Sequence, residues 1–346
     1  MTDQIYNKQS GNISRRSVLA SLPLLGLGSR LLAQQASALR IKKINCFEVR
    51  VADPARTTAF YQDMFGMPVQ SRFGDRVCLQ VGSGPQFMAI RALLPGETAA
   101  ITHIGYSVEN FNVTAQQTAL VAQGYKTIDP PALSATGIDF AMHTWVRMRG
   151  ATPELYFADP RGLILQLSDE SYCGGSGPLG SGCGQPEIPA AGLFSLYDIN
   201  HFTAFLNDGA GANTYYQELF GLSVQSYQGP GSPVTGTGDG KQFVMYAGGV
   251  QPDAKTPANL HHGCFNMPDF NVDAILAKLT AYGLKDRGDK QIGPLMHYIS
   301  LRQPERGGAV GGTPELYFTD PDGILMQLQD ITYCGGGGYL GNECLV

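Results

Sequence analysis

The chain repeats itself, and this repetition limits its fold more than any other feature of the sequence. Residues 152–162 (TPELYFADPRG) return as residues 313–323 (TPELYFTDPDG). Three shorter segments return in the same order: residues 44–47, 60–66 and 172–175 return at 199–202, 215–221 and 333–336. Because a long repeat of this kind indicates copies of one structural unit, we predict two domains. They cover residues 41–184 and 196–346, and a Gly/Pro-rich linker at 185–195 joins them.

Each repeat shows one strand, one helix and several strands, and then the same series again. Residues 44–51 are rich in strand-forming side chains and end before Asp53 and Pro54. Helical spacing over residues 55–65 stops at Gly66, a typical C-terminal cap. We therefore predict an α+β fold of tandem βαβββ modules, four in all.

The N-terminal residues 1–38 have the pattern of a targeting segment. Residues 14–19 (SRRSVL) contain paired arginines, and an interrupted apolar stretch and the small residues Ala36, Ser37 and Ala38 follow. This order resembles a Tat-type signal peptide, which is removed after export. A disordered basic arm is the alternative. Export would place the mature chain in the periplasm or outside the cell.

The charge of the mature chain argues against several partners. Without residues 1–38 the chain has 20 basic and 28 acidic side chains, a net charge of −8. An acidic chain of this kind disfavours nucleic acid and anionic membrane surfaces. The mature sequence has no apolar run of about 20 residues, so we expect no membrane anchor. A small molecule remains the expected partner.

Four of the seven cysteines form two matched pairs, Cys173 with Cys183 and Cys334 with Cys344. Each pair encloses a Gly-rich loop, which lets the sulfur atoms meet in an oxidising compartment. We predict two disulfides. A zinc site is the alternative, but no histidine accompanies these cysteines at ligand spacing. The other three, Cys46, Cys78 and Cys264, are expected to be buried thiols.

These motifs together resemble the vicinal oxygen chelate (VOC) superfamily, which includes glyoxalases, bleomycin resistance proteins and extradiol dioxygenases. The resemblance covers most of residues 41–333. It implies that paired βαβββ modules close into two cup-shaped half-barrel domains, each able to hold a divalent metal. Residues 316–327 (LYFTDPDGILMQ) resemble the extradiol dioxygenase tail motif, except that the final acid is Gln327.

The resemblance assigns metal ligands to the first strand of each module and to the last strand of the second module. In repeat two these positions are His201, His262 and Gln327. Two imidazoles and one oxygen donor can hold Fe(II) and leave open positions for substrate. The neutral amide of Gln327 replaces the usual carboxylate, so the cation is held by less negative charge. Fe(II) is favoured, and Mn, Zn or Ni are alternatives.

The matching positions in repeat one are Cys46, His103 and Gln166. A buried cysteine is more often a core residue than a ligand, so we expect no metal there. His103 is then a remnant of the ligand set.

Two further residues of repeat two are candidates for catalysis. His297 has a reference pKa near neutral pH and is a candidate general acid or base. Tyr317 lies on a predicted strand and could donate a hydrogen bond to bound substrate. The alternatives are a hydrogen-bonding role in the core for His297 and packing for Tyr317.

Together these features favour an exported, metal-dependent enzyme that acts on a small molecule with two vicinal oxygens. Extradiol-dioxygenase-like activity is the leading hypothesis because of the tandem layout and the tail motif. A lyase or isomerase of the glyoxalase type is the alternative enzyme. The other class is a non-catalytic protein that binds a small molecule, as in bleomycin resistance; Cys46 and Gln327 favour that class.

Overall fold

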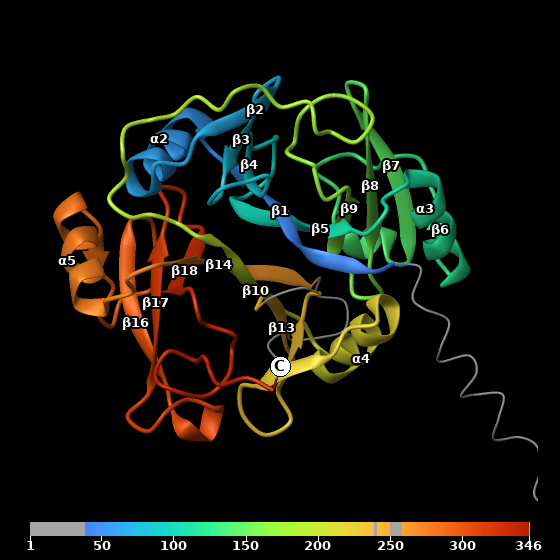
Figure 1. Cartoon of the computed structure of the whole chain (residues 1–346). Helices are drawn as coiled ribbons and strands as arrows, with labels where there is room; N and C mark the ends of the chain where they lie inside the picture. Colours follow the sequence, from blue (N-terminus) through green and yellow to red (C-terminus); the bar gives the residue numbers. More distant parts are fainter. Residues whose placement is uncertain (1–38, 239–240, 250–257, 346) are drawn as a thin grey trace, which may run out of the picture. The chain divides into compact units, whose positions relative to one another are not determined.

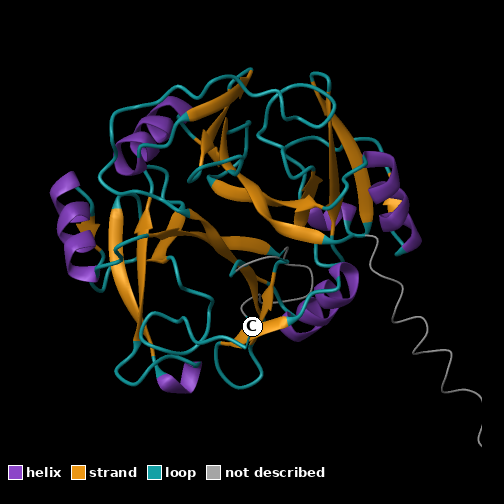
Figure 2. Ribbon diagram, in the orientation of Figure 1, coloured by secondary structure: helices purple, strands orange, loops and turns teal. Residues whose placement is uncertain are grey.

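The strands of each repeat curve into a half of one sheet with helices on its outer face, and the halves join where Leu260 pairs with Ile101 (Figures 1 and 2). The computed structural model describes residues 39–238, 241–249 and 258–345, so the proposed signal peptide at 1–38 lies outside it. No helix among these described residues is long and apolar enough to cross a membrane.

The first repeat contains two modules, in this order: β1 (Ile41–Val51), α2 (Pro54–Phe65), β2 (Val69–Phe73), β3 (Arg76–Gln80), β4 (Phe87–Ala92), then β5 (Ala100–Val108), α3 (Val113–Ala122), β6 (Lys126–Thr127), η1 (Gly137–Phe140), β7 (His143–Arg149), β8 (Thr152–Ala158) and β9 (Ile164–Ser168). The second repeat follows the same order: β10 (Asp198–Phe205), α4 (Gly209–Phe220), β11 (Val224–Tyr227), β12 (Pro233–Gly236), β13 (Phe243–Ala247), then β14 (Asn259–Met267), α5 (Val272–Tyr282), β15 (Lys285–Asp286), β16 (Met296–Arg302), η2 (Pro304–Arg306), β17 (Thr313–Thr319) and β18 (Leu325–Asp330).

The first strands of the modules lie at the centre of each sheet. In repeat one, β1 pairs parallel with β4 and antiparallel with β5, and β5 pairs with β9. In repeat two, β10, β13, β14 and β18 pair in the same way. The four predicted βαβββ modules are confirmed. The second module of each repeat also has a two-residue strand, β6 or β15, that the sequence pattern did not predict.

The two repeats share one hydrophobic core. Helix α2 lies over the second module of the other repeat, where Phe60 and Phe65 contact Phe318 at ring-centroid distances of 6.3 and 5.7 Å (Figure 1). In the same manner, Phe220 of α4 contacts Tyr106 and Phe157 of repeat one at 5.6 and 6.3 Å. Each repeat therefore buries the apolar outer face of the other.

The repeated Asp-Pro-x-Gly turns make polar contacts across the same boundary. In one turn, Asp322 accepts from the Ala52 backbone N–H and forms an ion pair with Arg56 at 3.0 Å. In the other turn, Arg161 donates to Asp208, the N-cap of α4, at 2.8 Å. Each turn thus stabilises the start of the helix that the other repeat contributes.

The connecting segment between the repeats also packs against repeat one. Glu187 forms a bridge with Val69, and the Phe194 backbone N–H donates to the Met64 carbonyl. The Phe194 side chain is buried in the shared core. The predicted linker therefore has a packing role as well as a connecting one.

Both predicted disulfides, Cys173–Cys183 and Cys334–Cys344, are confirmed, and Cys46, Cys78 and Cys264 are buried thiols as expected. Each bond closes a short loop after the last strand of its repeat. Closing a loop of this length stabilises a protein mainly by restricting the unfolded chain.

We expect the double substitution Cys173→Ser/Cys183→Ser to lower the free energy of unfolding by about 2–3 kcal/mol, the loop-entropy value for this length. Denaturant unfolding of the variant and the parent would measure the difference. The pair Cys334→Ser/Cys344→Ser should cost a similar amount. Equal stability of parent and variants would show that the disulfides do not restrict the conformations of the unfolded chain.

The side chain of Asp320 is buried, which makes it a weaker acid than usual. Its Oδ1 accepts from two backbone N–H groups, while its Oδ2 is buried without a hydrogen-bond partner. Burial, opposed by those hydrogen bonds and reinforced by nearby Asp322, raises the pKa of Asp320 from 3.8 to about 7. The folded state therefore holds this proton more tightly than the unfolded state does.

Because the folded pKa is the higher one, the stability linked to Asp320 is fully present below pH 3.8 and is lost as pH rises through about 7. We expect thermal stability to fall between roughly pH 4 and 7 in the parent, the range in which only the folded state holds the proton, and to fall less in Asp320→Asn. The exposed Asp129→Asn variant is the control and should follow the parent. A pH profile that Asp320→Asn leaves unchanged would contradict this assignment.

Candidate metal centre

Three adjacent strands carry the predicted ligands of repeat two. His201 lies on β10, His262 on β14 and Gln327 on β18. In the antiparallel β10–β14 pair His262 is opposite Thr203, and in the parallel β14–β18 pair Gln327 is opposite Cys264. Neighbouring strands in these registers bring side chains of one sheet face together.

The structure brings these three side chains together. The imidazole centroids of His201 and His262 are 5.7 Å apart, and both rings contact the side chain of Gln327. The three residues are 2%, 5% and 1% exposed. Since Nε2 of Gln327 has no hydrogen-bond partner, the contact to both rings runs through Oε1.

Asn200 fixes the protonation of His201. Its Nδ2 donates to the Tyr333 carbonyl at 2.9 Å, which turns its Oδ1 toward Nδ1 of His201 at 2.7 Å. An amide oxygen only accepts, so Nδ1 of His201 must carry the proton. The other ring nitrogen, Nε2, then keeps its lone pair. Metal-binding histidines are commonly oriented by an acceptor of this kind.

This arrangement sets two acceptors against each other. The Nε2 lone pair of His201 faces Oε1 of Gln327, and neither atom has a proton to offer. Burial lowers the pKa of His201 from 6.5 to about 3, so a second proton on the ring does not solve the conflict at neutral pH. A cation between the two atoms removes the conflict, as does a turn of the amide that brings Nε2 of Gln327 to the lone pair. The donor set therefore fits a divalent metal ion.

His262 is held in a similar way. Its Nδ1 is 2.9 Å from Nδ1 of His261, whose ring stacks on Phe205. Burial lowers the pKa of His262 well below its usual value, and the neighbouring histidines His201 and His261 lower it further. The ring is therefore neutral and its Nε2 faces Gln327.

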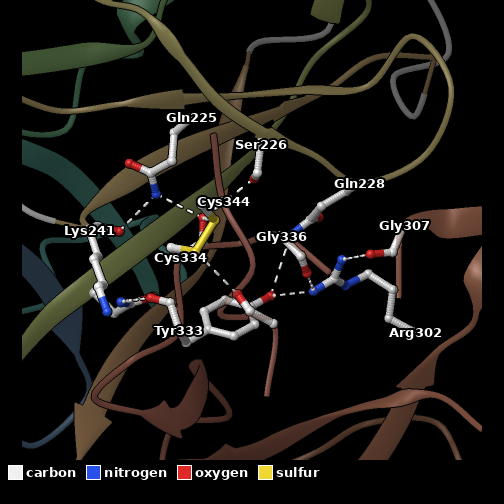
Figure 3. Close-up of a disulfide and its surroundings, with 12 residues drawn as sticks. Gln225, Ser226, Gln228, Lys241, Arg302, Gly307, Tyr333, Cys334, Gly336 and Cys344 are labelled. Atoms are coloured by element: carbon white, nitrogen blue, oxygen red, sulfur yellow. Dashed lines mark hydrogen bonds between the residues drawn. A yellow bond between two sulfur atoms is a disulfide. The ribbon is translucent and has the colours of Figure 1, made fainter. Parts of the chain in front are cut away.

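The second disulfide loop supports this centre (Figure 3). Gln225 donates to the Cys334 carbonyl at 2.8 Å, and Arg302 donates to the Gly336 carbonyl at 2.9 Å. These bonds fix the loop that contains Tyr333, whose carbonyl orients Asn200. The ring of Tyr333 lies 5.6 Å from that of His201, and Phe243 stacks on His201 at 4.4 Å.

Tyr317 lies beside the two histidines. Its ring meets His262 edge to face at 5.3 Å, and its hydroxyl donates to Glu315 at 3.3 Å. Glu315 also forms a buried ion pair with Arg302. Glu315 therefore neutralises an arginine and does not replace the carboxylate that Gln327 lacks.

His297 does not lie with the other candidates. Its Nε2 is 3.0 Å from the hydroxyl of Thr280 on α5, so its ring faces the helix layer. Strand alternation puts its neighbour Tyr298 on the cup side, where it stacks on Tyr317. Both repeats contain a Met-His pair, Met142-His143 and Met296-His297, and these pairs are one residue out of register. His143 pairs with Ala158, while His297 pairs with Phe318, one position earlier in its repeat.

Repeat one keeps the same geometry with a different donor set. The Cys46 thiol and His103 Nε2 lie 3.8 and 3.3 Å from Oε1 of Gln166. Burial raises the pKa of Cys46, so the thiol keeps its proton and donates. The amide oxygen is therefore satisfied without a cation.

Asn45 shows what repeat one lacks. Its Nδ2 donates to the Tyr172 carbonyl at 2.8 Å, as Asn200 does in repeat two, but its Oδ1 is buried without a partner. A histidine at position 46 would supply the missing N–H. Sequence reasoning missed both asparagines, although each directly precedes a ligand position in the repeated motif.

In the part of the chain that the structure describes, no three His, Cys, Asp or Glu side chains gather closely enough to hold a metal. The third donor at the centre in repeat two is the amide of Gln327, which explains this result. A cation held by these residues would have a neutral oxygen as its third ligand.

The fold is that of an extradiol dioxygenase. One similar solved structure is homoprotocatechuate 2,3-dioxygenase from Brevibacterium fuscum in an anaerobic complex with 3,4-dihydroxyphenylacetate. It is 18% identical, with a TM-score of 0.57, over 86% of this chain and 83% of that one. The enzyme of the same name from Arthrobacter globiformis is 18% identical, with a TM-score of 0.56, over 86% and 81%. No protein-family model and no curated protein sequence matches the chain.

We expect Cys46→His to create a second metal site, because the new ring can donate to Asn45 Oδ1 and face Gln166 together with His103. Gly105 lies beside position 46 and has no side chain. A Cβ at position 105 would lie 2.4 Å from the sulfur of Cys46, so the glycine keeps this space open for the side chain at 46. Metal analysis should show one more bound ion per chain than in the parent. Cys78→Ala is the control and should bind no additional metal. An unchanged metal content in folded Cys46→His would contradict the role given to Asn45.

Proposed function

We propose that repeat two is a mononuclear metal centre in which His201, His262 and Gln327 hold a divalent cation. The observation that carries this proposal is the orientation of His201 by Asn200, which leaves an unprotonated nitrogen facing the amide oxygen of Gln327. With Oε1 toward that nitrogen, the buried contact is repulsive unless a cation lies between the two atoms; without a cation, the amide must turn its Nε2 to the ring. Fe(II) is the favoured ion for two imidazoles and one oxygen, with Mn, Zn or Ni as alternatives.

The substrate we propose is a small molecule with two adjacent oxygens, such as a catechol or an α-hydroxy carbonyl compound. A bound divalent ion supplies charge stabilisation for an anionic oxygen of such a substrate. Because Gln327 brings no negative charge, two positive charges remain on the centre for the substrate to neutralise. Ligands that bind as anions are therefore favoured over neutral ones.

The activity we propose is that of an extradiol-like dioxygenase. Support comes from the fold, which is shared with homoprotocatechuate 2,3-dioxygenase, and from the solved complex of that enzyme with 3,4-dihydroxyphenylacetate, itself a catechol. A glyoxalase-type lyase or isomerase would use the same ligands with a different substrate. Fold alone does not decide between them.

Protein side chains around the centre have separate tasks in this proposal. Asn200 and His261 orient the two imidazoles, and Tyr317 packs against His262 and bounds the substrate side of the cup. His297 faces α5 on the other side of the sheet, so it acts as a general acid or base only if β16 rearranges.

We also propose that the chain acts outside the cytoplasm. The twin-arginine pattern in residues 1–38 and the two disulfides both point to an oxidising compartment.

A binding protein without catalysis is the second candidate. The close stacking of Phe243 on His201 favours it because it reduces the room beside the imidazole. The neutral Gln327 favours it because an amide holds a cation less strongly than a carboxylate does.

Metal titration by calorimetry separates these candidates. We expect chelator-treated protein to bind one ion in repeat two, and His201→Ala and His262→Ala to weaken that binding at least about 100-fold. Gln327→Glu should strengthen it at least tenfold, since a carboxylate replaces a neutral oxygen. His297→Ala is the matched control and should bind metal as the parent does.

Activity then distinguishes enzyme from binding protein. Protein loaded anaerobically with Fe(II) should cleave a catechol when O₂ is admitted, and His201→Ala should not. Metal affinity equal in the parent, His201→Ala and His262→Ala would end the metal proposal. Tight metal binding without turnover of any catechol or α-hydroxy carbonyl compound would leave the binding protein as the answer.

A further inference from the structure

A cavity opens into the cup of repeat one, away from the centre described above. Its volume is about 60 Å³. One water molecule needs roughly 10–15 Å³ on this measure, so the cavity has room for a small organic group. The residues that define its character are Glu48, Arg91, His103, Trp145, Arg147 and Arg149.

Positive charge exceeds negative charge around this cavity. Three glutamates, Glu48, Glu97 and Glu154, form ion pairs with four arginines: Arg50, Arg76, Arg91 and Arg149. A fifth, Arg147, donates to the carbonyl of Pro131, a neutral acceptor that leaves its charge uncompensated. Burial lowers the pKa of His103, so this ring adds no charge. The group therefore has an excess of two positive charges.

Repeat two lacks these charges at the same strand positions. Its β10 and β13 pair as β1 and β4 do, and its β16 and β17 pair as β7 and β8 do. By these registers, the counterparts of Glu48, Arg91 and Arg147 are Thr203, Ala247 and Ser300. The fold alone therefore does not require charge at these positions.

Stability does not explain the network either. Burying ion pairs costs desolvation energy that their attraction often fails to recover, so neutral packing serves a core equally well. Glu48 is 4% and Arg91 8% exposed. A charged wall that faces a cavity is instead typical of a binding site, where a few polar groups select the ligand.

Next to these charges the lining of the cavity is aromatic, since Trp145 and Arg147 lie two residues apart on the same face of β7. Trp145 stacks on Tyr156 at 5.9 Å with an angle of 10° between the rings, and Phe140 meets Trp145 edge to face. A planar group can lie against such a wall. Arginine binds carboxylates in two parallel hydrogen bonds, so the arginines and the neighbouring rings together select a planar acid.

We propose that the repeat-one cup binds a small planar carboxylate, with Arg147 as the partner of the acid and Trp145 with Tyr156 as the surface on which its planar part lies. This site is separate from the metal centre of repeat two and needs no metal. Repeat one would then bind a ligand of its own, although the set of metal ligands in repeat one is incomplete.

Trp145 is the only tryptophan of the chain, so its fluorescence reports directly on this cavity. We would titrate the protein with sodium acetate, pyruvate and benzoate at constant ionic strength. At least one acid should change the fluorescence saturably with a dissociation constant below about 1 mM, and benzoate should bind at least tenfold more tightly than neutral benzamide. Arg147→Gln should weaken the binding at least tenfold.

Two variants control the titration. Arg72→Gln removes an exposed arginine on β2 and should bind the acids as the parent does. His201→Ala should also bind them unchanged, which separates this site from the metal centre. The proposal is overturned if no acid gives a saturable change, if benzamide binds as well as benzoate, or if folded Arg147→Gln binds as the parent does.

Discussion

The orientation of one amide determines what the second cup can do. Asn200 is held by the Tyr333 carbonyl, and this contact leaves its oxygen only one use, to accept from His201. Without that constraint His201 could carry its proton on either nitrogen and satisfy Gln327 with an ordinary hydrogen bond. The Cys334–Cys344 loop matters to the site for this reason, because it positions Tyr333 (Figure 3).

Much of the fold follows from the sequence because it depends on local and repeated patterns. The strand and helix periods, the Gly66 cap and the copied motifs predict the four modules. The candidate ligand positions 201, 262 and 327 come from the resemblance to the superfamily, and alignment of the repeats selects His262 over His261. The sharing of helices between repeats has no such local pattern. The contact of Phe65 with Phe318 joins residues far apart in the chain, and an amphipathic helix does not reveal which sheet it covers.

Side-chain roles were harder to predict than positions. His297 was a candidate because of its residue type, but one step along a strand decides between the cup and the helix layer. The repeated Met-His pair concealed a shift of one residue between the repeats. The sequence did not predict the charged cluster in the cup of repeat one, because Glu48, Arg91 and Arg147 are distant in sequence and meet only in the folded sheet. The two cups have thus diverged in chemistry, toward neutral donors in one and arginines in the other.

The exchange of helices between the repeats has a consequence for how such a chain can evolve. Helix α2 of repeat one covers repeat two, and α4 of repeat two covers repeat one. Deleting either repeat would therefore expose an apolar surface on the other. Selection acting on one cup therefore preserves the other as well. A repeat whose own site is not under selection is still needed for folding, and the residues of its cup can change until they bind a different ligand.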